Sequence, residues 1–319
     1  MGARTGYTPS DLGCIVPTRE RPGKLRKLLA SIAGQTVRCG PVIVVASGES
    51  VEDVVKEFSG KLDVRYYHSE EGGQIRQRNM GIARLDDATR LVASFDDDIV
   101  LEPEAVERIL ELWNSVEPDT AGVAFNIVNN APYRFVIVQA LIGLGIPRQG
   151  RVFRSGYNVQ TSPVREDLKT QWLCGGATSW RKEILRDFRH RELNCRWAVC
   201  EDLVFSYPVG KKFPLYVCAA ARVMHEHVQD HTSDSRQQFY GRAMALWRLY
   251  FVESHGELSR GCYYYTLAAQ IVARTLAGLF TFNKGQLQYA AGLFAGGREG
   301  ARALRAKRPI AELLEGGSC

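Results

Sequence analysis

Between residues 13 and 128, short apolar runs alternate with stretches of mixed polarity, and this alternation limits the folds that the chain can adopt. Each run has the length of a buried strand. The runs lie at 14–16, 42–45, 64–67, 91–95 and 122–128. Helices are expected between them, from Pro22, over 51–58, over 75–85 and from Pro103. Buried strands that alternate with helices are typical of a mostly parallel sheet flanked by helices, so we expect an α/β fold.

Beyond residue 128 the pattern is less regular. Residues 129–170 are irregular and basic, and they predict a loop or an insertion over the site. The later expected elements are an ordered stretch at 172–186, a helix that begins at 201, a strand at 215–219, and helices from 235 that are broken near 256 and at 283–285. We therefore expect a C-terminal helical extension after the sheet.

Three consecutive carboxylates, Asp96, Asp97 and Asp98, directly follow the apolar run at 91–95. At the end of a buried strand they repel one another and lose hydration, which is costly unless a cation binds there. A divalent metal that carries a phosphate is the expected partner, because hard oxygen ligands suit Mg²⁺ or Mn²⁺. The alternative is that the carboxylates open a helix over 99–113. One Asp would meet that need and three exceed it, so we prefer the metal site.

The position of the acidic triplet in the predicted sheet agrees with a ligand site. In open α/β sheets, ligands bind at the carboxyl ends of the strands. The triplet lies at such an end, and residues 17–22 lie at the end of the first strand. The two segments are therefore expected to face one cleft.

The charge balance indicates the kind of ligand, and the cysteines indicate the compartment. Lys and Arg outnumber Asp and Glu by 41 to 35, and the net charge of +6 suits an anionic ligand or an anionic membrane surface. The eight cysteines form neither CxxC pairs nor a regular disulfide framework, so a reducing, cytoplasmic location is expected. The polar stretch through Asp11 shows no secretory pattern.

One stretch, 262–282, has the length of a membrane span, but it contains Gln270 and Arg274. A buried C-terminal helix is the commonest explanation for such a pattern. Peripheral association with the inner face of a membrane and burial in a homodimer stay open as alternatives.

Six short motifs along residues 13 to about 230 occur together in one order. They are VPTR (16–19), RNMGI (78–82), FDDD (95–98), WLCGGA (172–177), CEDLVFS (200–206) and ARVMH (221–225). In this order and at these spacings the set resembles the family 2 glycosyltransferases of bacterial type, which have the GT-A fold. Each motif is weak alone, and the ordered set is what makes the resemblance specific.

The resemblance implies an enzyme that moves a sugar from a nucleotide-sugar donor, with inversion, in the presence of Mn²⁺ or Mg²⁺. It implies a GT-A domain over 11–230, with a nucleotide-binding half at 11–128 and an acceptor half at 129–230, followed by a helical region at 231–319. The acceptor would be a glycan, a lipid-linked sugar or a small molecule. The chain lacks the QxxRW motif of processive synthases, so one sugar per cycle is expected.

The resemblance also assigns roles around the triplet. Asp98 is the expected metal ligand, and Asp96 and Asp97 are expected to meet the ribose or the sugar. His225 is a candidate for a second metal ligand. A purely structural role for His225, or metal binding by His227 instead, stays open.

Further residues are assigned to the donor, the acceptor and the base. The donor candidates are Pro17, Thr18, Arg19, Arg21, Arg78 and Asn79, among which the arginine forks match phosphate oxygens. The acceptor candidates are Trp172, Gly175 and Gly176. An inverting displacement needs a base for the acceptor hydroxyl, and Asp202, helped by Glu201, is the expected one. Helix capping is the alternative role for Asp202.

One feature departs from the family. The family usually carries an acidic pair after its second strand, where this chain has VASGE at 45–49. Another contact, or a nucleotide other than a uridine one, is therefore open. Alternatives for the whole chain are a nucleotidyltransferase, which would normally have glycine in the 17–22 loop, and a non-catalytic sugar-nucleotide-binding protein. A dehydrogenase is disfavoured because no GxGxxG follows the first strand.

Overall fold

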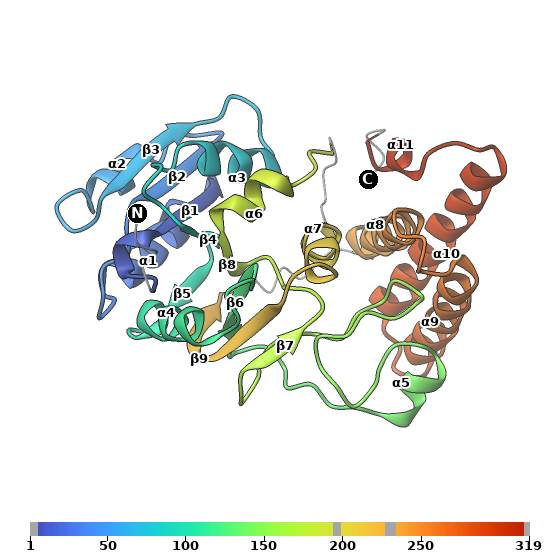
Figure 1. Ribbon diagram of the computed structural model, residues 1–319. Helices are drawn as coiled ribbons and strands as arrows, with labels where there is room; N and C mark the ends of the chain where they lie inside the picture. The colour runs from blue at the N-terminus through green and yellow to red at the C-terminus, as the bar shows by residue number, and fades with distance from the viewer. Residues whose placement is uncertain (1–5, 194–198, 227–233, 316–319) are drawn as a thin grey trace. The chain divides into compact units, whose positions relative to one another are not determined.

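The computed structural model describes residues 6–193, 199–226 and 234–315, and it divides into two compact units. The first, the sheet unit, contains 6–133, 160–192 and 205–226. The second, the helical unit, contains 134–159, the described residues of 193–204, and 234–315. Figure 1 shows the elements of both units.

The described part of the sheet unit holds one nine-stranded sheet with the order β3-β2-β1-β4-β8-β6-β9-β5, and β7 pairs with β9 off this path. The strands are β1 (Leu12–Arg19), β2 (Val42–Ser47), β3 (Val64–His68), β4 (Leu91–Phe95), β5 (Ile99–Leu101), β6 (Gly122–Ile127), β7 (Leu168–Thr170), β8 (Ala177–Arg181) and β9 (Leu215–His225). Strands β3, β2, β1 and β4 pair in parallel, whereas β8 is antiparallel to both β4 and β6. The expected α/β sheet is confirmed, and the antiparallel strands make it mixed.

Helices cover both faces of this sheet, because successive residues of a buried strand point to opposite sides. The helices of the unit are α1 (Pro22–Ala33), α2 (Glu52–Lys56), α3 (Gln74–Ala83), α4 (Ala105–Ser115), α6 (Lys182–Asp187) and the sheet-unit part of α7 (Glu201–Gly210). Cys14 and Val16 pack with apolar residues of α1, α2 and α4. Ile15 packs in a second cluster that includes Ile184 of α6 and Phe205 of α7. The alternation along β1 therefore anchors helices on both sides.

The predicted helix over 99–113 is wrong at its start. Residues Ile99–Leu101 form β5, which pairs antiparallel with β9, and α4 begins only at Ala105. Three apolar residues fit a strand as well as a helix, and the tertiary pairing decides between them. The triplet therefore lies in a turn between two strands and does not open a helix.

Two other segments differ from their expected form. Strand β9 continues from Leu215 to His225, beyond the expected 215–219, so His225 lies within it. The stretch 129–170 contains the short helix α5 (Ile137–Leu141) and the edge strand β7, and its part 134–159 belongs to the helical unit.

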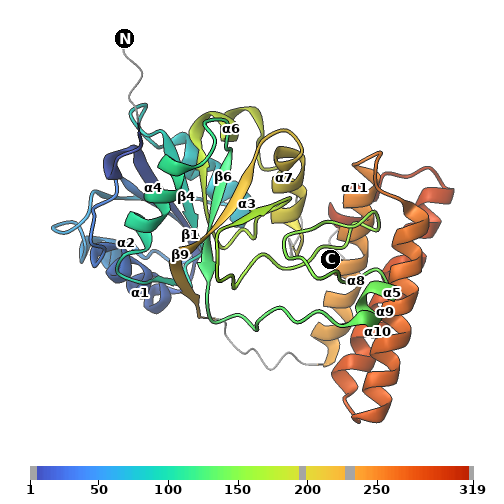
Figure 2. The same cartoon turned by 60° about the horizontal axis from the view of Figure 1, so that its bottom comes forward.

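The helical unit is built mainly from α8 (Asp234–Glu253), α9 (Arg260–Phe280), α10 (Lys284–Arg305) and α11 (Ile310–Glu315), which confirms the expected helices and breaks. Figure 2 shows α8, α9 and α10 side by side. Helix α10 approaches α8 very closely, since a Cβ on Gly292 would overlap the carbonyl group of Gln238. Among the described residues, no helix has the length and apolar character needed to cross a membrane.

Candidate active site

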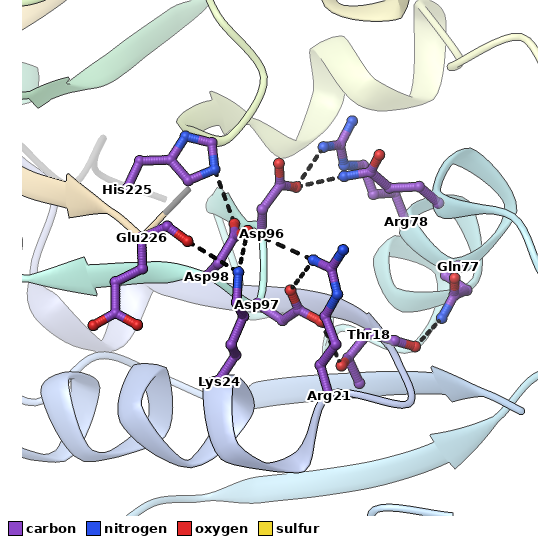
Figure 3. Close-up of polar contacts among 11 residues, drawn as sticks. Thr18, Arg21, Lys24, Gln77, Arg78, Asp96, Asp97, Asp98, His225 and Glu226 are labelled. Carbon is purple, nitrogen blue, oxygen red and sulfur yellow. Dashed lines mark hydrogen bonds and ion pairs between the residues drawn. The ribbon is translucent and has the colours of Figure 1, made fainter. Parts of the chain in front are cut away.

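The triplet lies at the carboxyl end of β4, and its three side chains face different partners (Figure 3). Asp97 is buried at 5% exposure. Its Oδ2 accepts a 2.7 Å hydrogen bond from Thr18 Oγ1, and its Oδ1 accepts one of 3.1 Å from Arg21. Burial raises the pKa of Asp97, and Asp98 adds to the rise, while Thr18 and Arg21 oppose it. Asp97 therefore joins the ends of β1 and β4.

Asp98 contacts three basic side chains. Its Oδ1 lies 2.9 Å from His225 Nε2, and its Oδ2 lies 2.9 Å from Lys24 Nζ and 3.5 Å from Arg21. Burial opposes ionisation of Asp98, but the hydrogen bonds from His225 and Lys24 outweigh it and hold its pKa well below the usual range. Asp98 is thus a carboxylate with an imidazole at one oxygen and an ammonium at the other.

Asp96 is held by the first two turns of α3. Its Oδ1 accepts hydrogen bonds from Arg78 at 2.8 Å and from Gln74 at 2.6 Å. Arg78 is buried at 2% exposure, so its charge is directed at Asp96. The neighbouring Gln77 donates to the carbonyls of Thr18 and Val45 at 2.8 and 2.7 Å and so ties α3 to the ends of β1 and β2.

Gly176 completes the surroundings of Asp96. Its carbonyl accepts a 2.9 Å hydrogen bond from the Asp96 backbone N–H. A Cβ on Gly176 would lie 3.3 Å from Asp96 Oδ2 and 3.9 Å from the His225 ring. A side chain there would be in tight contact with Asp96 Oδ2, which explains the small residue just before β8.

The donor set around Asp98 fits a hard divalent cation. Within the described residues, no group of three or more His, Cys, Asp or Glu side chains is arranged to hold a metal ion alone. Mg²⁺ usually takes one or two carboxylates and completes its shell with water and substrate phosphates, and Mn²⁺ also prefers carboxylate, carbonyl and water oxygens. Asp98 and His225 would supply an oxygen and a nitrogen ligand, with the remaining positions left to a diphosphate.

Other predicted residues lie elsewhere in the sheet unit. Pro17 is buried within β1, and the Arg19 side chain at its end is 67% exposed. Asn79 donates to Glu192 Oε1 at 2.9 Å and to the His190 carbonyl at 3.1 Å. It lines a cavity of about 910 Å³ together with these two residues, away from the contacts of the triplet.

The acceptor and base candidates have the following surroundings. Trp172 is 7% exposed, and its carbonyl accepts a 3.0 Å hydrogen bond from Thr170 Oγ1; Gly175 is partly exposed. Glu201, which is buried, and Asp202 form the first turn of α7 and belong to the helical unit. His227 lies outside the described residues.

Two groups at the triplet were not expected from the sequence. Lys24 lies in the first turn of α1 and looks like an ordinary surface lysine, although its place three residues after Arg21 puts both on one helix face. Gln74 starts α3 and has no charge to mark it. Lys24, Arg21 and Arg78 each contact a carboxylate of the triplet, so positive side chains surround all three carboxylates.

Comparison with known proteins identifies the family of the chain. The model of the family described as "Glycosyl transferase family 2" matches residues 14–188, more than half of the chain. The chain therefore belongs to glycosyl transferase family 2. The predicted resemblance to this family is confirmed.

Two individual proteins are similar over different lengths. Validoxylamine A glucosyltransferase of Streptomyces hygroscopicus subsp. jinggangensis (strain 5008) is 29% identical over 115 residues, which cover 34% of this chain and 27% of that enzyme. The structure of mannosyltransferase PcManGT from Pyrobaculum calidifontis, in complex with GDP-Man and Mn²⁺, superposes with a TM-score of 0.54 and 14% sequence identity. That match covers 97% of this chain and 87% of the other, and it shows a shared GT-A fold.

Proposed function

We propose that the protein is an inverting, divalent-metal-dependent glycosyltransferase that moves one sugar per cycle to a glycan, lipid-linked or small-molecule acceptor. The observation that carries this proposal is the contact of Asp98 with His225, 2.9 Å apart, at the carboxyl end of β4. The Asp98 carboxylate, from the turn after β4, and the His225 imidazole, from β9, meet there, and basic side chains lie beside them. Such a point would suit a divalent metal, held by these two side chains, that supplies positive charge to the diphosphate of the donor.

The metal would neutralise the leaving diphosphate without a proton, which is what a glycosyl diphosphate needs when its sugar departs. Asp98 and His225 would hold the metal. Arg21 contacts both Asp97 and Asp98 with half of its side chain still exposed, so it can turn a guanidinium face to the phosphates. Asp96 and Asp97 would then contact the ribose or the sugar.

We assign the base to Asp202, with Glu201 beside it, on the strength of the CEDLVFS motif. Inversion by direct displacement requires removal of the acceptor proton as the hydroxyl attacks. The two adjacent carboxylates at the start of α7 provide groups of the right kind for this step. Trp172, Gly175 and Gly176 are the proposed acceptor contacts.

The donor nucleotide and the compartment are proposed at a coarser level. PcManGT is described in complex with GDP-Man, and the Streptomyces relative is named as a glucosyltransferase. The test of the donor nucleotide therefore includes GDP beside other nucleotides. A reducing cytoplasm is the proposed compartment. It is supported by the free thiols of six cysteines among the described residues.

Thermal unfolding with UDP, dTDP, GDP and CDP, each with and without Mn²⁺, tests the proposal. A ligand that binds only the folded state stabilises it by RT ln(1 + [L]/Kd). We expect one nucleotide to raise the Tm only in the presence of Mn²⁺, and we expect Asp98→Asn to lose this response. The exposed Asp119→Asn, with the same chemical change, is the control and should retain it. A response that is independent of metal, or retained in Asp98→Asn, would refute the metal assignment.

The stereochemistry requires its own measurement. Once the donor is known, NMR of the product formed at early times reports the anomeric configuration. Opposite configurations in donor and product would support inversion, and the same configuration would refute it while leaving the metal site intact.

A further inference from the structure

The outward face of α9 is apolar along most of its length. Tyr265, Val272, Leu276, Leu279 and Phe280 are 60%, 57%, 47%, 57% and 80% exposed. Their spacing of seven, four, three and one residues puts them on one side of the helix. Surface helices normally carry polar residues on that side, so the face is unusual for a helix in contact with water.

Neighbouring elements extend this surface. In Figures 1 and 2, α5 lies beside α9, and the Tyr265 hydroxyl donates a 2.8 Å hydrogen bond to the Leu141 carbonyl. Ile137 of α5 is 72% exposed, and Phe282 in the turn after α9 is 93% exposed. We call the exposed apolar side chains of α5, α9 and this turn the apolar face.

Positive charges predominate in the segments that form the apolar face, although Glu253 lies beside the start of α9 and pairs with Arg260. Residues 134–159 contain four arginines and no carboxylate, and residues 260–297 contain no carboxylate either. On α10, the exposed Phe294 is followed by Arg298, Arg302 and Arg305, which are also exposed and share its side of the helix by their spacing. The helical unit therefore combines exposed apolar side chains on α5 and α9 with exposed arginines on the neighbouring helix α10.

We propose that the apolar face binds the surface of a bilayer that contains anionic lipids. A helix that lies in the membrane interface has this composition: large apolar side chains enter the acyl boundary, and arginines at the border meet the headgroup phosphates. A contact between two copies of this chain fits less well. A twofold contact would place one predominantly positive surface against itself and offer its arginines few acidic partners.

Vesicle sedimentation tests this inference without donor or acceptor, so it can fail or succeed independently of the proposed transferase activity. The full chain is mixed with phosphatidylcholine vesicles that contain 30% or 0% phosphatidylglycerol, and bound protein is measured in the pellet. We expect binding to the anionic vesicles, at least tenfold weaker binding to the neutral ones, and at least a tenfold loss for the double variant Leu276→Glu/Phe280→Glu. The control Lys61→Glu changes the net charge by the same amount at an exposed site of the sheet unit and should bind like the natural sequence.

The other outcomes overturn the inference. Equal binding by the double variant and the natural sequence would mean that the apolar face is not the contact. If the protein bound neither kind of vesicle, the proposal of membrane binding would be refuted. Light scattering after size exclusion tests the alternative, in which the apolar face contacts a second copy of the chain. A dimer that the double variant converts to a monomer, without vesicle binding, would assign the face to a second copy of the chain.

Discussion

Replacement of Lys24 by methionine separates two effects at the triplet. The Lys24 ammonium lies 2.9 Å from Asp98 Oδ2 and donates a second 2.9 Å hydrogen bond to the Glu226 carbonyl. The Lys24 and Asp98 side chains are only 19% and 12% exposed, so the contact is not screened like a surface ion pair. Hydrogen bonds to charged groups contribute about 1.5–3 kcal/mol, and we expect Lys24→Met to lower the free energy of unfolding by about 2 kcal/mol.

The same replacement should strengthen metal binding. In the metal-free protein the ammonium neutralises the carboxylate that we assign to the metal, and a divalent cation at Asp98 must displace or repel it. Removal of about 1.4 kcal/mol of repulsion corresponds to a tenfold gain in affinity. This is modest beside the Coulomb repulsion between an ammonium and a divalent cation that contact the same carboxylate. We therefore expect Lys24→Met to bind Mn²⁺ roughly tenfold more tightly while it unfolds more easily.

Electron paramagnetic resonance of free Mn²⁺ measures the affinity without nucleotide or turnover, and denaturant unfolding measures the stability. Lys27→Met is the matched control, because Lys27 loses the same charge from the same helix but contacts the exposed carboxylate of Glu226 at 2.8 Å. Mn²⁺ binding by Lys24→Met that is unchanged or weaker than in the natural sequence would refute competition at Asp98.

Three further outcomes follow from named contacts. Asp202→Asn should abolish transfer and leave donor binding unchanged in calorimetry, and substantial transfer by this variant would remove the base assignment. Thr18→Val should lose about 2 kcal/mol of stability in denaturant unfolding, because it leaves the buried Asp97 carboxylate without its 2.7 Å hydrogen bond; a change within 0.5 kcal/mol would contradict this. Burial, with a smaller effect of Arg78, lowers the pKa of His190 to about 3 from 6.5, so its neutral form stabilises the fold above pH 6.5 and this stability is lost as the pH falls. The loss should be about 1 kcal/mol by pH 5.5, and His190→Gln should remove that part of the pH dependence.

The sheet and the triplet were predictable because they depend on local pattern. The apolar run at 91–95 has the length of a buried strand, and three carboxylates after it mark a site without knowledge of their partners. The partners themselves depend on contacts across long stretches of sequence. Thr18 meets Asp97 from 79 positions away, and Lys24 meets Asp98 from 74. Lys24 carries no local sign of this contact, because a lysine in a first helical turn is usually solvated.

The predicted helix start at residue 99 was wrong and the role of His225 stayed open for the same reason, which is the pairing of β5 with β9. If residues 99–101 continued into α4, the end of β9 would lose its pairing with the segment that directly follows the triplet. Because they form β5, Ile99 lies opposite His225 in the antiparallel ladder, and the Glu226 N–H donates to the Asp98 carbonyl at 2.8 Å.

Asn129 then holds His225 from the other side, with 2.9 Å hydrogen bonds to both its backbone N–H and its carbonyl. The imidazole thus reaches Asp98 because strand pairing and Asn129 fix the backbone of His225, and these are long-range contacts that local sequence patterns do not encode. A strand of three residues, too short to recognise by periodicity, turns an acidic cluster into a carboxylate–imidazole pair suited to a metal.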